Sequence, residues 1–221
     1  MDKKILTYHD LIKIKASENN EPMVDLMDEV PEIICRYEKM DMTDYLGEKI
    51  YTRQSLAELL AKASLRLKAK YPDYSFKVVY GYRHPEIQQK YFDKRKAELK
   101  EEKPDLSDQE LNELAHLFVA APEVAGHIVG GAVDLTITRP AGDLDMGTKI
   151  ADFSEAEKIQ TFFDGLTVEQ KKNRKLLHDL MLEQGLAPFY GEWWHFCYGD
   201  KEWAAFYGKS KSLYSALDFR L

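Results

Sequence analysis

The sequence predicts an α+β fold, in which a small and mostly antiparallel sheet has helices packed around it and a metal site lies at the sheet in a cleft. Three observations lead to this class: a few short segments of alternating polarity, longer segments with helical periodicity, and two motifs of histidine and carboxylate residues beside the expected strands. The helical segments precede and surround the strand segments. This order favours helices packed on one face of the sheet.

The first clear helix is expected from Ser55. Residues 55–58 (Ser-Leu-Ala-Glu) have the pattern of a capping box, and the apolar residues that follow have helical spacing. A second helix is expected from Pro85 to about Lys103. Its closing stretch mixes charges of both signs, which is more typical of a solvated face than of a binding patch.

Two more capping boxes predict two more helices. Residues 107–110 (Ser-Asp-Gln-Glu) open a helix that stops near Pro122, and residues 167–170 (Thr-Val-Glu-Gln) open another. Gly185 is a suitable residue to end the last of these helices, because glycine adopts the left-handed conformation found after many helix ends.

Strand signals are fewer and shorter. Residues 75–80 alternate before Gly81, residues 132–138 alternate strictly, and residues 194–198 are short and rich in aromatic side chains. Residues 30–35 are a candidate edge strand. In the strictly alternating segment Asp134 falls on the polar face, where a simple solvated aspartate is the plain alternative to any function.

Length and composition indicate one globular domain over residues 1–221, with residues 1–29 as a poorly defined N-terminal extension. The net charge of −7 argues against nucleic acid or an anionic membrane as a partner, because both require a basic surface. No apolar run is long enough to span a membrane, and the N-terminus lacks the apolar region of a signal peptide. Two cysteines without a disulfide framework favour the reduced cytoplasm.

His127 and Asp134 form the first candidate pair of metal ligands. His127 follows one glycine and precedes two more, so it lies on a loop that bends easily into the strand carrying Asp134. A loop residue and a strand residue seven positions apart can then bind one ion. Each residue alone is more often a surface group.

Residues 192–195 (Glu-Trp-Trp-His) supply the rest of the site. A spacing of three puts Glu192 and His195 on opposite faces of a strand but on one side of a turn, so a turn is expected at residues 191–192. The two tryptophans are either core residues or the apolar shell of a metal site. Two imidazoles, one carboxylate and a spare carboxylate are the inventory of a catalytic zinc site with an open position for water.

Arg83 is the candidate oxyanion-binding residue. It follows a strand directly and precedes a helix that starts with proline, so its guanidinium can point into a cleft and hold a developing oxyanion or a substrate carboxylate. A surface arginine paired with a helix acid is the alternative. The other histidines lack matching partners and are poor candidates as ligands: His9, His84, His116 and His178.

The motifs together resemble the D-alanyl-D-alanine dipeptidases among the LAS metallopeptidases, a group that also holds zinc D,D-carboxypeptidases and the hedgehog signalling domain. The resemblance covers roughly residue 30 to the carboxyl end, and the stretch 144–148 (Leu-Asp-Met-Gly-Thr) favours the dipeptidase branch. The matching segments are residues 81–85, 127–136, 145–148, 170–176 and 192–195.

This resemblance implies one Zn²⁺ per chain, bound by His127, Asp134 and His195. It implies Glu192 as the general base, which passes a proton from water to the leaving amine, and Arg83 as the group that stabilises the tetrahedral intermediate. The implied partner is a short peptide substrate. Structural zinc usually has four protein ligands, so three ligands with an open position favour catalysis.

Three positions depart from the family pattern. Tyr80 stands where aspartate is common before Gly-Tyr-Arg, Ala125 where serine is common before the histidine, and Ala151 where aspartate is common after the Met-Gly-Thr stretch. These positions resemble ones that contact substrate, so we expect intact chemistry with altered specificity. Asp152, next to Ala151, can replace the missing carboxylate if its loop shifts by one residue.

The function that the sequence predicts is therefore zinc-dependent hydrolysis of short peptides, of the D-alanyl-D-alanine dipeptidase type with an altered substrate pocket. A D,D-carboxypeptidase or another dipeptidase of the same superfamily is the second enzyme alternative. A zinc-binding module without catalysis is the alternative from another class, and Glu192 and Arg83 argue against it.

Overall fold

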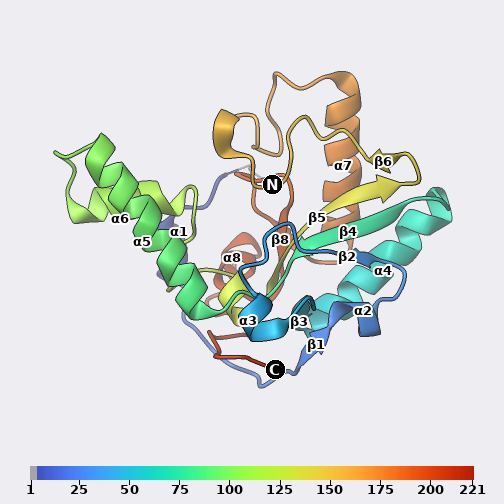
Figure 1. The fold of residues 1–221 in the computed structure, drawn as a ribbon, viewed down its shortest axis with the longest axis horizontal. Coiled ribbons are helices and arrows are strands. Elements are labelled where there is room, and N and C mark those ends of the chain that lie inside the picture. The colour runs from blue at the N-terminus through green and yellow to red at the C-terminus, as the bar shows by residue number, and fades with distance from the viewer. Residues whose placement is uncertain (1–3) are drawn as a thin grey trace.

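A six-stranded sheet with the order β2-β4-β5-β8-β7, and with β6 paired to β5, forms the centre of the fold (Figure 1). The computed structural model describes residues 4–221. Apart from the parallel pair of β2 and β4, the strand pairs described in this sheet are antiparallel, which confirms the predicted sheet. The strands are β2 (Ile34–Cys35), β4 (Ser75–Tyr80), β5 (Ala132–Arg139), β6 (Gly142–Asp143), β7 (Ala187–Pro188) and β8 (His195–Cys197).

Two groups of long helices surround the sheet. The first group, α4 (Gln54–Lys70) and α7 (Val168–Glu183), packs its apolar faces into the main core with β4 and β5. The second group, α5 (Pro85–Glu102) and α6 (Asp108–His116), forms a hairpin that projects to the left of the sheet in Figure 1 and surrounds a smaller core. The short elements are α1 (Tyr8–Leu11), β1 (Met23–Asp25), α2 (Leu26–Glu29), α3 (Thr43–Leu46), β3 (Tyr51–Arg53) and α8 (Lys201–Phe206).

Strand β5 is buried on both faces. The predicted apolar face, Val133, Leu135 and Ile137, is fully buried in the main core. The opposite face is buried too, because Ala132 lies in an apolar cluster with Trp203 and Ala204 of α8. Asp134 on that face is only 8% exposed, so it is not a solvated aspartate.

Two of the three predicted capping boxes are present and one is not. The hydroxyls of Ser107 and Thr167 cap α6 and α7 as expected. Ser55 instead lies inside α4, which begins at Gln54, and both its backbone N–H and its hydroxyl donate to the carboxylate of Glu21. The prediction at Ser55 was wrong because a carboxylate from a distant segment occupies the helix N-terminus, where negative charge is favourable.

The N-terminal segment, which the sequence leaves undefined, contributes to the fold from Lys4 onward. Strand β1 pairs with β3, and Glu18 binds Arg53 of β3 at 2.9 Å. The backbone N–H of Arg53 donates to the carbonyl of Gly130, and its Nε donates to the carbonyl of Val129. The segment thereby supports the loop that carries His127.

Among residues 4–221, none of the helices combines the length and the apolar character that a membrane span requires. The ends of α5 and α7 agree closely with their terminal signals, but α6 ends at His116, well before the expected stop near Pro122. Helix α5 begins at Pro85 and ends one residue before the expected Lys103, and Gly185 follows α7 with φ +85°. The candidate edge strand at residues 30–35 is reduced to β2, since Val30 ends α2 instead.

Candidate metal centre and active site

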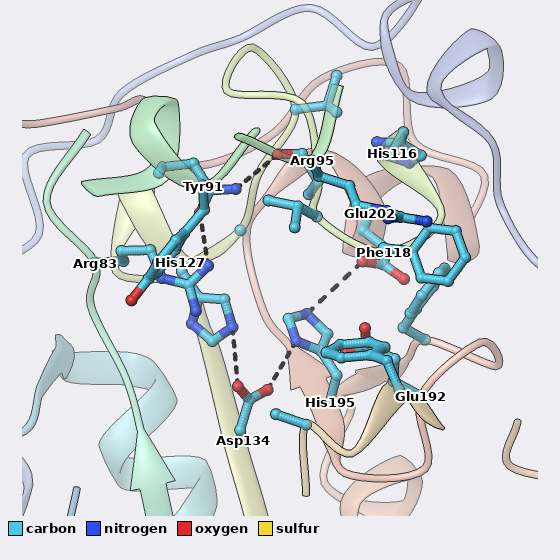
Figure 2. A pocket seen from close by; sticks show the side chains of 18 of the residues that line it. Arg83, Tyr91, Arg95, His116, Phe118, His127, Asp134, Glu192, His195 and Glu202 are labelled. Atoms are coloured by element: carbon cyan, nitrogen blue, oxygen red, sulfur yellow. Dashed lines mark hydrogen bonds and ion pairs between the residues drawn. The ribbon is translucent and has the colours of Figure 1, made fainter. Parts of the chain in front are cut away.

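Three side chains from three parts of the chain converge beside the end of β5 (Figure 2). Asp134 lies on β5 opposite His195 on β8, and His127 begins a short 3-10 turn, His127–Val129. His127 Nε2 lies 3.4 Å from Asp134 Oδ2, and His195 Nδ1 lies 3.0 Å from Asp134 Oδ1. One ligand atom from each residue falls within 4.8 Å of the others, and all three residues are buried.

A glycine turn returns the chain from His127 to the strand. Gly130 has φ +71°, a conformation that costs glycine little, and the N–H of Gly131 then donates to the carbonyl of Gly126. Gly126 is also close-packed, because a Cβ there would collide with the carboxylate of Asp200. The glycines that flank His127 therefore serve the convergence expected from the sequence.

The three residues differ in charge: Asp134 is anionic, whereas His195 holds a proton that a bound metal would replace. Burial raises the pKa of Asp134, but the neighbouring imidazoles outweigh it and hold that pKa well below its usual range. Burial lowers the pKa of His195, yet its hydrogen bond to Asp134 raises the pKa to about 9. Two imidazole nitrogens and one carboxylate oxygen at these separations form a donor set that fits zinc.

Glu192 lies next to this centre on the turn that the sequence predicts. The N–H of His195 donates to the Glu192 carbonyl, which closes the turn and places the two side chains on one side. Burial raises the pKa of the Glu192 carboxyl to about 7. A carboxyl group with a pKa near neutrality can both accept and return a proton.

Arg83 reaches the same cavity from the loop between β4 and α5. Its guanidinium stacks over Tyr80 at 4.5 Å, and its Nη1 donates to Gln88 Oε1 at 2.9 Å. Its Nε is buried without a partner among the described residues. The side chain is thus fixed in orientation and retains a free donor.

The cavity that joins these groups has a volume of about 330 Å³. Its walls come from the turn at His127, from β8, from α8 and from the hairpin of α5 and α6. Beside the predicted site residues it is lined by several side chains that the sequence did not single out: Lys39, Tyr91, Arg95, Phe118, Phe153 and Glu202.

The three departures from the family pattern have different surroundings. The Tyr80 hydroxyl donates to Asp41, which also accepts from the Tyr91 hydroxyl. Ala151 lines the cavity with φ +54°. Ala125 packs in a small apolar cluster with Tyr214 and is not part of the cavity wall.

Asp152 does not take the place of a carboxylate at position 151 in this structure. Its Oδ1 accepts from the backbone N–H and the hydroxyl of Ser154, so the side chain caps a short turn. It lines a different hollow, on the side of β6. The replacement considered for Asp152 would require these bonds to break.

The remaining histidines lie outside the metal centre. His84 contacts Asp218 at 2.9 Å, and His9 lies 3.5 Å from Glu113. His178 lies on α7, while His116 lines the cavity but contacts no ligand.

A second group of candidate ligands in the described chain consists of His195, Cys197 and Glu202, and it shares His195 with the first. None of the motifs recognised in the sequence includes Glu202, which enters from α8. Only the packing of α8 against the cavity reveals it.

His116 makes the cavity wall sensitive to acid. Burial lowers the pKa of His116 to about 4, and its Nδ1 accepts from the N–H of Ala121. In the unfolded chain this histidine has its ordinary pKa near 6.5. The contribution of His116 to the free energy of unfolding is therefore complete above that pH and is lost as the pH falls toward 4. We expect wild-type protein to lose about 2–3 kcal/mol more than His116→Gln between pH 7 and pH 4.5. Urea unfolding of both proteins at both pH values measures this difference. Equal losses in the free energy of unfolding would contradict the lowered pKa of His116.

An α+β fold whose cavity gathers a zinc-type donor set, a glutamate and an arginine is typical of a zinc peptidase. The family model described as D-ala-D-ala dipeptidase, Peptidase_M15, matches residues 41–212, and the chain belongs to this family of zinc peptidases. A D-alanyl-D-alanine dipeptidase from Synechocystis sp. is 32% identical over 89 residues. That match covers 35% of this chain and 36% of the relative's length.

Solved structures with a similar fold include two of VanY-type proteins and one of an LD-carboxypeptidase. A mutant of the vancomycin resistance D,D-pentapeptidase VanY in complex with Zn(II) is 20% identical, with 70% and 76% of the two chains covered and a TM-score of 0.42. VanYB with D-alanine-D-alanine is 17% identical, with 86% of each chain covered and a TM-score of 0.48. The LdcB LD-carboxypeptidase is 22% identical, with coverage of 85% and 72% and a TM-score of 0.46.

Proposed function

We propose that this chain is a zinc-dependent dipeptidase of the D-alanyl-D-alanine dipeptidase type with an altered substrate cavity. The observation that carries the proposal is the convergence of the three candidate ligands in one cavity with Glu192 and Arg83. A zinc-binding module without catalysis requires neither a half-buried glutamate with a pKa near 7 nor a fixed guanidinium beside the ligands. Membership of the peptidase family supports the same proposal.

His127, Asp134 and His195 would hold the metal. When bound there, zinc would supply the Lewis-acid chemistry that activates water and polarises a peptide carbonyl. Glu192 accepts a proton from the attacking water and returns it to the departing amine, which its pKa near 7 permits in both directions. The guanidinium of Arg83 stabilises the negative charge that develops on the carbonyl oxygen.

The role of Arg83 predicts a loss of turnover without a loss of metal. We expect Arg83→Ala to lower kcat/KM by about 10²–10³, which is the usual cost of removing one oxyanion donor. Bound zinc should stay at the wild-type level, because Arg83 contacts Tyr80, Tyr91 and Gln88 rather than serving as a ligand. Steady-state kinetics with elemental analysis measures both, and wild-type kcat/KM would remove Arg83 from the mechanism.

The altered cavity predicts weak activity on D-Ala-D-Ala. Ala151 offers no carboxylate to a substrate ammonium, and the Tyr80 hydroxyl is already bonded to Asp41. Losing one charge-assisted hydrogen bond costs on the order of 1.5–3 kcal/mol, or roughly ten- to a hundredfold in kcat/KM. We therefore expect the cavity to accept a larger or less charged amino-terminal residue.

A panel of dipeptides tests the proposed function. Zinc-loaded protein should hydrolyse at least one of the L,L, D,D or mixed dipeptides, and bulkier or amino-acylated substrates should compete well with D-Ala-D-Ala. High efficiency with strict preference for D-Ala-D-Ala would overturn the altered specificity. Cleavage of longer peptides only at their carboxyl ends would favour a carboxypeptidase instead.

A further inference from the structure

The two ring nitrogens of His195 face two different carboxylates. Nδ1 lies 3.0 Å from Asp134 Oδ1, on the side where the candidate ligands converge. Nε2 points the other way and lies 3.8 Å from Glu202 Oε2 (Figure 2). The imidazole therefore lies between the metal centre and a carboxylate to which the proposed mechanism gives no role.

Glu202 is placed there by the start of α8. Asp200 caps this helix by accepting the N–H of Trp203 at 2.7 Å, and Glu202 follows in the first turn with only 8% of its surface exposed. Its Oε1 has no partner among the described residues, although it is buried. A buried carboxylate without a full set of partners is costly, so its position beside His195 needs a physical reason.

His127 shows what the second nitrogen of a candidate ligand does in this site. Its Nε2 faces Asp134, while its Nδ1 lies 2.7 Å from the carbonyl oxygen of Gly81. A carbonyl oxygen only accepts, so this contact fixes the proton on Nδ1 and leaves Nε2 free to bind a metal. Histidine ligands usually donate their other ring N–H to an oxygen in this way.

We propose that Glu202 is the matching positioning residue for His195: it accepts the Nε2 proton, so that Nδ1 is presented unprotonated to the metal. The inference rests on the proposed zinc site. Closing the separation of 3.8 Å to a hydrogen bond requires a movement of about 1 Å, which a side-chain rotation supplies. Glu202 acts through His195 and does not contact the metal.

The main alternative to this proposal is a second metal site formed by the other candidate ligand group. If His195, Cys197 and Glu202 bound their own ion, Nε2 would be a ligand and could not carry a proton. The two arrangements exclude each other at this one nitrogen. A third arrangement has Glu202 bind the ammonium group of the substrate, because its carboxylate also lines the cavity.

Zinc affinity, measured by competition with a chromophoric chelator, tests the proposal. We expect Glu202→Leu to bind zinc about 10- to 100-fold more weakly, the usual cost of removing such an orienting partner. Glu202→Gln retains an acceptor oxygen and should lose less. The matched control is Glu98→Gln, which changes another carboxylate of the cavity wall that pairs with Arg95, and its affinity should stay within about twofold of wild type.

Three results would overturn the proposal. Wild-type affinity in both Glu202 variants would remove the positioning role. A wild-type protein that binds two zinc ions, with one lost in Glu202→Leu, would establish the second metal site. A raised KM for dipeptides with a free ammonium group, with unchanged zinc affinity and unchanged KM for acylated substrates, would assign Glu202 to the substrate.

The readout also separates this proposal from the proposed function. Zinc affinity is measured on protein without substrate, so a wild-type chain that binds zinc but hydrolyses no dipeptide would overturn only the function. If Glu202→Leu does not fold, Glu202→Gln and the visible spectrum of cobalt-loaded protein carry the test. A changed ligand-field spectrum in Glu202→Gln supports the positioning role, and an identical spectrum with wild-type affinity contradicts it.

Discussion

Glu192→Gln is expected to retain zinc and to lose turnover by a factor of about 10²–10⁴, the usual contribution of a positioned acid–base group. Glutamine has nearly the same size as glutamate but cannot accept the proton of the attacking water. The carboxyl of Glu192 lies beside the metal centre, and burial raises its pKa to about 7. Steady-state kinetics on the best dipeptide of the panel, together with zinc content, measures the effect.

The same variant has a clear failure mode. Glu192 is not one of the three converging ligands, so elemental analysis should give the wild-type zinc content. If the variant keeps wild-type turnover, Glu192 is not the base and the chain uses another mechanism. A variant that loses zinc as well would instead make Glu192 a metal ligand.

His195→Ala is expected to abolish most zinc binding and, with it, activity. Three protein ligands hold the metal in the proposed site, so removing one leaves it under-coordinated. The cavity left by the imidazole opens next to Asp134, which also loses its hydrogen bond at 3.0 Å. Elemental analysis after dialysis measures the loss.

The control for this variant is His178→Ala. His178 is also buried, but it lies on α7 and contacts Asp179 rather than the metal centre. It should retain a full equivalent of zinc. A full equivalent in His195→Ala would show that the assignment of ligands is wrong.

Local sequence signals predicted most of the fold around the site. The alternation of β5, the proline that begins α5 and the capping boxes of α6 and α7 all act within a few residues, so one stretch of sequence is enough to predict them. The capping box at Ser55 failed because Glu21, thirty-four positions away, bonds there. Short elements such as β1 and α8 depend on pairing and packing with distant segments, which local patterns do not record.

Some residues of the site could likewise be predicted from local sequence, and others could not. Two short motifs contain all three candidate ligands and Glu192, and the pairing of Asp134 with His195 between β5 and β8 brings the motifs together. Glu202 reaches the cavity, and Asp41 accepts from its lining residue Tyr91, from segments without a recognisable pattern. Their contribution depends on tertiary packing, so the sequence alone could not assign it.

A zinc titration of metal-free protein, followed by dipeptide hydrolysis at each step, tests the central claim most directly. The proposed site predicts activity that rises in proportion to added zinc, reaches a plateau at one equivalent per chain and is abolished by a chelator. Activity that is unaffected by the chelator, or a protein that binds one zinc ion and hydrolyses none of the dipeptides, would contradict the claim that this cavity is a zinc-dependent dipeptidase site.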